Sequence, residues 1–150
     1  MKLRVIWIAP KSRSKEPAYD VLTREYVGRI GKYQSIEASC LASESALIKL
    51  IEQSAGRTKP WLVLLDSRGS LMSSEQFAEF LEVQHSLDTQ QLLFAIGPAD
   101  GFGDSVRKAA NQVVSLGKMT LPHELARVVL LEQIYRAFTI IRNHPYHCGH

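Results

Sequence analysis

The sequence has few cysteines and no long hydrophobic run. Cys40 and Cys148 stand alone, without a CxxC pair, so neither a disulfide framework nor a paired-cysteine site is indicated. The apolar opening at 3–9 is short and contains Arg4, which is typical of a buried first strand and not of a signal peptide. No segment approaches the roughly 18 apolar residues that a membrane-spanning helix needs. We therefore expect a soluble protein of the reducing cytoplasm, with no membrane partner.

Composition excludes disorder and leaves the type of partner open. The 150 residues suit a single domain over 1–150. Hydrophobic residues make up 45%, enough for a core without disulfide or metal support, and charged residues make up 22%. The net charge of +3 permits a polyanionic partner such as RNA, but it fits an ordinary basic enzyme equally well.

Short apolar runs alternate with segments of helical periodicity. Strands are expected at 3–9, 35–41, 61–65, 92–96 and 113–116, and helices at 16–30, 43–54, from 73 onward, 104–110 and 121–142. Ser73 and Gln76 have the spacing of a capping box at the start of the third helix. The alternation predicts an α/β fold with a mostly parallel sheet and helices on both faces.

Two of the expected helices have informative apolar faces. The first is predicted to bury Val21, Leu22, Tyr26 and Ile30 on one side. The last is apolar on two sides. One face is formed by Leu130, Ile134, Ala137, Phe138 and Ile141, and further apolar positions are Leu125, Val129 and Ile140. The sheet covers only one side of such a helix, so a second copy of the chain is the simplest cover for the other. An irregular core within one chain is the alternative.

Three loops follow predicted strands, at 65–69, 97–103 and 116–121. In open α/β sheets, ligands bind beyond the carboxyl ends of the strands, so these loops are candidates for a binding site. The glycines of the second loop do not form G-x-G-x-x-G, and no Gly-Lys-Ser/Thr follows them. Their spacing is explained equally well by a turn that requires positive φ.

The carboxy-terminal tail, 143–150, is rich in histidine. Structural zinc usually takes four ligands from two separated pairs, so we expect no metal here. The tail is either a functional arm or a frayed end. In the first case Tyr146 stacks on a base and His147 contacts phosphate or moves a proton. Arg127, Arg136 and Arg142 precede the tail on the last helix and are candidates for RNA contact. For Arg136, an ion pair with Glu132 four residues earlier is the alternative.

The last third of the chain contains three distinctive stretches: SLGKMTLPHELARV at 115–128, EQIYRA at 132–137 and NHPYH at 143–147. Upstream, Leu65-Asp66-x-x-Gly69 and Ile96-Gly97 fit the same pattern. Together these motifs closely resemble the RlmH family of ribosomal RNA large-subunit methyltransferases, over nearly the whole chain.

The resemblance implies a minimal α/β-knot (SPOUT) fold with a trefoil knot in the carboxy-terminal half. It implies a homodimer that uses S-adenosylmethionine. The implied reaction is methylation of N3 of a pseudouridine in helix 69 of 23S ribosomal RNA, on assembled ribosomes. Two other readings stay open: a knot methyltransferase acting on another RNA such as tRNA, and a non-catalytic RNA-binding, ribosome-associated module.

The family's functional positions carry over residue by residue. Those that would hold the cofactor are Leu65, Gly97, Leu116, Gly117, Lys118, Met119, Thr120 and Leu121. Those that would meet RNA are Tyr146 and His147.

Two further residues bear on catalysis and one on cofactor binding. We expect His147 to accept the N3 proton and Arg136 to stabilise charge on a carbonyl oxygen. Pro98 stands where most family members have a second glycine. Because proline has no backbone N–H, a cofactor contact from that nitrogen is excluded.

Overall fold

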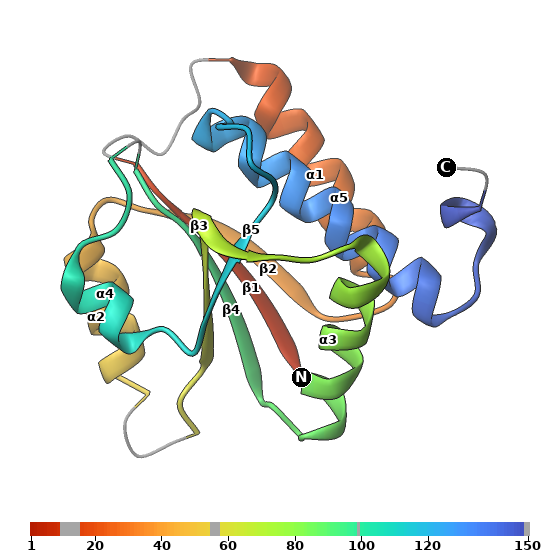
Figure 1. The fold of residues 1–150 in the computed structure, drawn as a ribbon, viewed down its shortest axis with the longest axis horizontal. Coiled ribbons are helices and arrows are strands. Elements are labelled where there is room, and N and C mark those ends of the chain that lie inside the picture. The colour runs from red at the N-terminus through yellow and green to blue at the C-terminus, as the bar shows by residue number, and fades with distance from the viewer. Residues whose placement is uncertain (10–15, 55–57, 99, 149–150) are drawn as a thin grey trace.

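Five parallel strands form a single sheet in the order β2-β1-β4-β3-β5 (Figure 1). The structure is a computed structural model that describes residues 1–9, 16–54, 58–98 and 100–148. The strands are β1 (Lys2–Ile8), β2 (Ile36–Leu41), β3 (Trp61–Leu71), β4 (Gln91–Ile96) and β5 (Gln112–Ser115). The inner strands β1 and β4 are mostly apolar and buried, as expected in a parallel sheet covered on both faces.

Helices cover both faces of the sheet, as predicted (Figure 1). On one face lie α1 (Pro17–Ile30), α3 (Ser74–Ser86) and α5 (His123–Ile141), with α5 packed between the other two. On the other face lie α2 (Glu44–Glu52) and α4 (Asp104–Ala109). Each face has its own apolar cluster, because side chains of a strand alternate between the two sides.

The capping box predicted at the start of α3 is confirmed. The Ser73 hydroxyl accepts the Gln76 N–H at 3.1 Å, and the Gln76 side chain accepts the Ser73 N–H at 2.8 Å. Two backbone donors of the first helical turn are thereby satisfied, which fixes where the helix begins. This start lies directly beside α5, where it helps to form a cavity described below.

The buried face predicted for α1 is wrong at two positions. Val21 and Leu22 are 52% and 37% exposed, while Thr23 and Ile30 are buried. The Thr23 hydroxyl donates to the Tyr19 carbonyl at 2.7 Å, so its polar atom is satisfied within the helix. Thr23 can therefore face the core, and the apolar pair is left at the surface.

Strand β3 is longer than predicted, and the expected loop at 65–69 lies within it. The pairing of β3 with β5 shifts register between Leu65 and Ser70. At Gly69, a Cβ atom would come within 2.7 Å of the Val113 carbonyl carbon, so only glycine allows the two backbones this close. The trefoil knot implied by the family resemblance stays a prediction.

The tail folds back onto α5. Asn143 adopts a positive φ of 54° just after the helix, which reverses the chain direction. A 3-10 turn, η1 (Pro145–His147), follows and packs against α5. The His144 ring nitrogen Nδ1 accepts the Tyr146 N–H at 3.2 Å and caps this turn. The frayed-end alternative is therefore wrong for residues up to 148.

Candidate cofactor cavity and carboxy-terminal tail

A cavity of about 710 Å³ opens beside the carboxyl ends of β4 and β5 and the irregular stretch 65–68 of β3. This is the edge where ligands bind in open α/β sheets, and the volume lies within the range of small-molecule sites. The structure brings together here most of the residues expected to hold a cofactor: Leu65, Gly97, Leu116, Gly117, Met119, Thr120 and Leu121. Lys118 is not among the lining residues.

The two glycines of the cavity have different structural roles. A Cβ atom at Gly97 would come within 2.9 Å of the Phe102 ring, so this glycine makes room for a buried aromatic side chain. Gly117 has a φ of +152°, and a Cβ there would meet nothing within 4 Å. The Ser115 hydroxyl accepts the Gly117 N–H at 3.1 Å and donates to its carbonyl at 2.7 Å, which fixes the turn. Gly97 is thus constrained by packing and Gly117 by backbone conformation.

Pro98 lines the same cavity. Its carbonyl accepts the Gly101 N–H at 2.9 Å, and Gly101 has a φ of +84°. Lacking a backbone N–H, Pro98 contributes only its ring and its carbonyl to the turn.

A charged group that the sequence did not single out lines one side of the cavity. The Asp66 carboxylate is buried, forms an ion pair with Arg107 and lies 3.3 Å from Arg68 Nε. The hydrogen bond from Arg68, reinforced by Arg107, holds the pKa of Asp66 well below its usual range. Asp66 is therefore an anion at neutral pH. In the sequence, only the position of Asp66 in the motif 65–69 pointed to this residue.

The tail is held by a network centred on Glu132, which the sequence indicated only as an ion-pair partner of Arg136. Its Oε1 atom accepts hydrogen bonds from Arg136 Nη2 at 2.7 Å and from the Tyr146 hydroxyl at 3.1 Å. The Tyr146 and Tyr135 rings meet edge-on, with their centres 4.7 Å apart. The Arg136 guanidinium lies 5.2 Å from the centre of the Tyr146 ring. Burial of the Tyr146 hydroxyl is the main reason why its pKa is raised. The predicted ion pair of Arg136 with Glu132 is confirmed.

The remaining tail residues differ in exposure. Arg142 is exposed at the end of α5. His147 is half-buried, and its Nδ1 atom is buried without a hydrogen-bond partner in the described part of the chain.

Arg127 is unsuited to RNA contact, contrary to expectation. Its side chain is 2% exposed, 3.3 Å from Asp20 Oδ1 and 4.1 Å from the centre of the Trp7 ring. Through these contacts, Arg127 links α1 and β1 to α5 within the core.

Within one chain, the tail follows the carboxy-terminal end of α5 (Figure 1), whereas the cavity lies at its amino-terminal end. His123 and Ala126 line the cavity, whereas Tyr146 contacts Glu132 and Tyr135. His123 and Glu132 are nine residues apart, or about 14 Å along a helix axis. The structure therefore does not bring His147 and Arg136 to the cavity of their own chain.

The described part of the chain comprises residues 1–9, 16–54, 58–98 and 100–148. No cluster of three or more His, Cys, Asp or Glu side chains there is arranged to hold a metal ion. No helix in these ranges has both the length and the apolar character needed to cross a membrane.

The fold and the cavity define the class of protein, a parallel α/β domain with its binding site at the strand ends. Residues 1–147 match the family model described as "Predicted SPOUT methyltransferase". The chain belongs to this SPOUT methyltransferase family.

Relatives of this chain carry a more specific name. It is 53% identical to the ribosomal RNA large subunit methyltransferase H of Koribacter versatilis over 150 residues, 100% of both chains. It is 40% identical to the protein of the same name from Geotalea daltonii, over 98% of this chain and 99% of that one. The resemblance to the RlmH group is thereby confirmed.

Solved structures agree on the fold. The SpoU methyltransferase AviRb from Streptomyces viridochromogenes, in complex with the cofactor AdoMet, aligns with a TM-score of 0.54 at 15% identity. The alignment covers 90% of this chain and 57% of that one. A probable methylase family protein from Haemophilus influenzae aligns with a TM-score of 0.54 at 10% identity, over 96% of this chain and 67% of that one.

Proposed function

We propose that this protein transfers a methyl group from S-adenosylmethionine to N3 of a pseudouridine in helix 69 of 23S ribosomal RNA. One observation carries the proposal: seven residues from three separate segments, expected from sequence to hold the cofactor, line one cavity. The names of the full-length relatives support ribosomal RNA as the substrate. The place of action that follows is the cytoplasm, and the unit is a single domain.

The chemistry of the cavity fits S-adenosylmethionine. Leu65, Leu116 and Leu121 offer apolar surface for a purine ring. Arg68 also lines the cavity, and its side chain is exposed. The amino-acid end of the cofactor carries a carboxylate, with which this guanidinium can pair.

The residues of the chain have mainly to bind and to orient. When bound, S-adenosylmethionine supplies a methyl group already activated by the sulfonium. The cavity residues would hold S-adenosylmethionine so that its methyl group is presented to N3. His147 takes the proton from N3, and Arg136 stabilises charge on the adjacent carbonyl oxygen.

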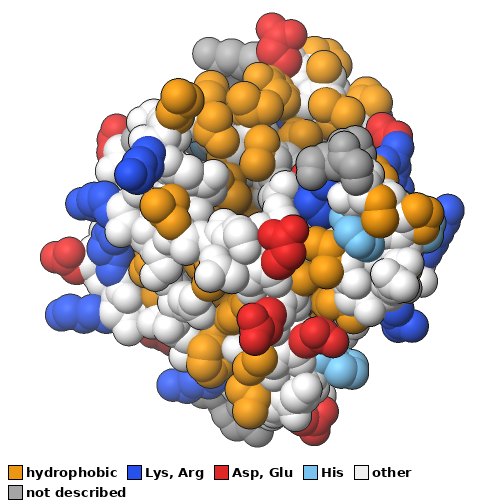
Figure 2. All heavy atoms as spheres, turned by 45° about the vertical axis from the view of Figure 1, so that its right-hand side comes forward, with side chains coloured by type: hydrophobic (Ala, Val, Ile, Leu, Met, Phe, Trp, Pro, Cys, Tyr) orange, Lys and Arg blue, Asp and Glu red, His pale blue; other side chains and the backbone are white. Residues whose placement is uncertain are grey.

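Because cavity and tail are separated within one chain, we propose that the protein acts as a homodimer in which the tail of one protomer serves the cavity of its partner. Exposed apolar residues support such an interface: Val21 and Leu22 on α1, and Met119 before α5 at 87% exposure. In Figure 2, hydrophobic side chains gather in the upper part of the face, at the end of the molecule where α1 begins. We expect light scattering at micromolar concentration to report a dimer. A stable monomer would refute it.

Mixing two inactive variants tests the shared site. One variant lacks the tail after Asn143, and the other carries Gly97→Val in the cavity. Exchange of protomers forms some dimers in which one intact cavity meets one intact tail, so part of the activity should return. A mixture that stays as inactive as its two components would contradict a site shared between protomers.

Transfer of labelled methyl groups to ribosomes tests the activity itself. A chain of 150 residues has little surface for recognising a long RNA, so the ribosome must supply most of the shape that is read. We expect strong labelling of 23S RNA in ribosomes and weak labelling of naked fragments. Labelling of tRNA would favour another knot methyltransferase. A protein that binds no S-adenosylmethionine by calorimetry would be an RNA-binding module only.

A further inference from the structure

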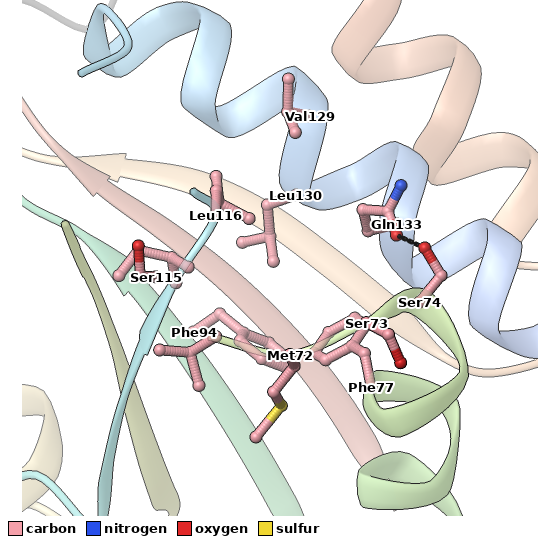
Figure 3. A pocket seen from close by; sticks show the side chains of 12 residues that line it. Met72, Ser73, Ser74, Phe77, Phe94, Ser115, Leu116, Val129, Leu130 and Gln133 are labelled. Atoms are coloured by element: carbon pink, nitrogen blue, oxygen red, sulfur yellow. Dashed lines mark hydrogen bonds between the residues drawn. The ribbon is translucent and has the colours of Figure 1, made fainter. Parts of the chain in front are cut away.

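A second, smaller cavity adjoins the cofactor cavity. It encloses about 300 Å³ between the start of α3, the end of β5 and the middle of α5 (Figure 3). Leu65 and Leu116 line both cavities, so the two share a wall. Reacting atoms in a methyl transfer must approach to about 3–3.5 Å, so the substrate has to occupy space next to the cofactor. The smaller cavity is in the right place for this.

The lining of the smaller cavity suits an uncharged ring with polar edges. Its walls include the apolar side chains of Phe94 and Leu130, together with the hydroxyls of Ser74 and Ser115 and the amide of Gln133 (Figure 3). None of the lining residues in the described ranges carries a charge. A phosphate or a carboxylate would therefore lose its hydration here without gaining an opposite charge. A nucleobase meets both the apolar walls and the polar groups.

The Gln133 amide is held in one orientation. Its Nε2 atom donates to Glu132 Oε2 at 2.8 Å, and a carboxylate only accepts, so the nitrogen end is fixed. Its Oε1 atom accepts the Ser74 hydroxyl at 2.6 Å, drawn as the dashed line in Figure 3. One N–H and one lone pair of Gln133 remain after these bonds. Both are available for a ligand, because Gln133 lines the cavity.

We propose that the smaller cavity holds the target base after it is extruded from the RNA, and that Gln133 reads its polar edge. This inference rests on the function proposed above. Enzymes that modify a base take it out of the stack into a pocket of this kind. A pseudouridine ring has two N–H groups. With N3 turned to the methyl donor, its N1–H and C2 carbonyl form an edge that matches the free donor and acceptor of Gln133. Uridine has no N–H at that place, so Gln133 is a specificity-determining residue.

Gln133→Met tests the assignment, since methionine has a similar length and no amide. We expect its affinity for S-adenosylmethionine to stay within about twofold of wild type. Its preference for ribosomes with pseudouridine over ribosomes with uridine should fall about tenfold or more, the loss expected when a buried hydrogen-bonding pair is removed. Gln53→Met, at an exposed position after α2 on the other face of the sheet, is the matched control and should change neither quantity.

A crystal structure of the wild-type protein with S-adenosylhomocysteine and pseudouridine monophosphate locates the base directly. A base beside Gln133 supports the proposal. A base elsewhere, or an empty cavity at saturating nucleotide, overturns it, as does an unchanged preference in Gln133→Met. Loss of cofactor binding in Gln133→Met would also overturn it, by making the cavity part of the cofactor site. Failure of the proposed function is a separate result, because wild-type protein would then bind no cofactor and methylate no RNA.

Discussion

The two ends of α5 are built on different principles. At its amino-terminal end, the cofactor cavity is formed by strand ends and turns, where Gly97 and Gly117 set the backbone path. At its carboxy-terminal end, the tail is held by side chains that converge on Glu132. Backbone geometry belongs to the fold, whereas a side-chain network can be exchanged or released without unfolding the sheet. The comparison implies that cofactor binding and RNA contact are separable properties.

Removing the tail should have the largest effect, because it separates RNA methylation from cofactor binding. Truncation after Asn143 deletes Tyr146 and His147 but leaves every residue of the cofactor cavity in place. We expect methyl transfer to ribosomes to be abolished, with dimerisation and S-adenosylmethionine affinity nearly intact. His147→Ala should lower turnover strongly for the same reason, since it removes the proton acceptor. Normal methylation by the truncated protein would mean that the tail has no part in the reaction.

A substitution at Gly97 should have the opposite pattern. In Gly97→Val, the new side chain displaces the buried Phe102 ring beneath the cavity, because even a Cβ atom lies 2.9 Å from it. We expect calorimetry to show loss of S-adenosylmethionine binding, and unfolding in urea to show about 1–3 kcal/mol of destabilisation from overpacking.

Gly28→Ala is the matched control for Gly97→Val. A Cβ atom at Gly28 meets nothing within 4 Å, and this glycine lies inside α1. Alanine there should stabilise the helix by about 0.5–1 kcal/mol and leave cofactor affinity unchanged. Wild-type affinity in Gly97→Val would remove Gly97 from the cofactor site.

Asp66→Asn should have a smaller effect than the changes at the tail and at Gly97, and its effect on stability should depend on pH. Arg68 and Arg107 lower the pKa of Asp66 in the folded protein. A lowered folded-state pKa contributes stability above the unfolded value of about 3.9, which is lost as pH falls below it. We expect the variant to be less stable by about 1–2 kcal/mol at pH 7. The difference should shrink as unfolding is followed down to pH 4 and below. A pH-independent difference would argue against an ionised Asp66.

The sequence predicted the sheet, the two helical layers and most of the cavity, because buried strands and glycine turns leave local patterns. It failed where a particular hydrogen bond or strand pairing decides the outcome. Thr23 enters the core because its hydroxyl bonds within the helix, which leaves Val21 at the surface. Polar residues continue β3 because β5 resumes pairing with it at Ser70. The bond between Tyr146 and Glu132 spans 14 positions and has no local signature.

Mass spectrometry of 23S ribosomal RNA is the most direct test of the central claim. Helix 69 is isolated from cells with the gene, from cells without it, and from deleted cells that carry the gene on a plasmid. The account predicts one methyl group on N3 of a pseudouridine, absent in the deletion and restored by the plasmid. The same methylated pseudouridine in all three samples would contradict it, as would a deletion that changes the modification of another RNA only.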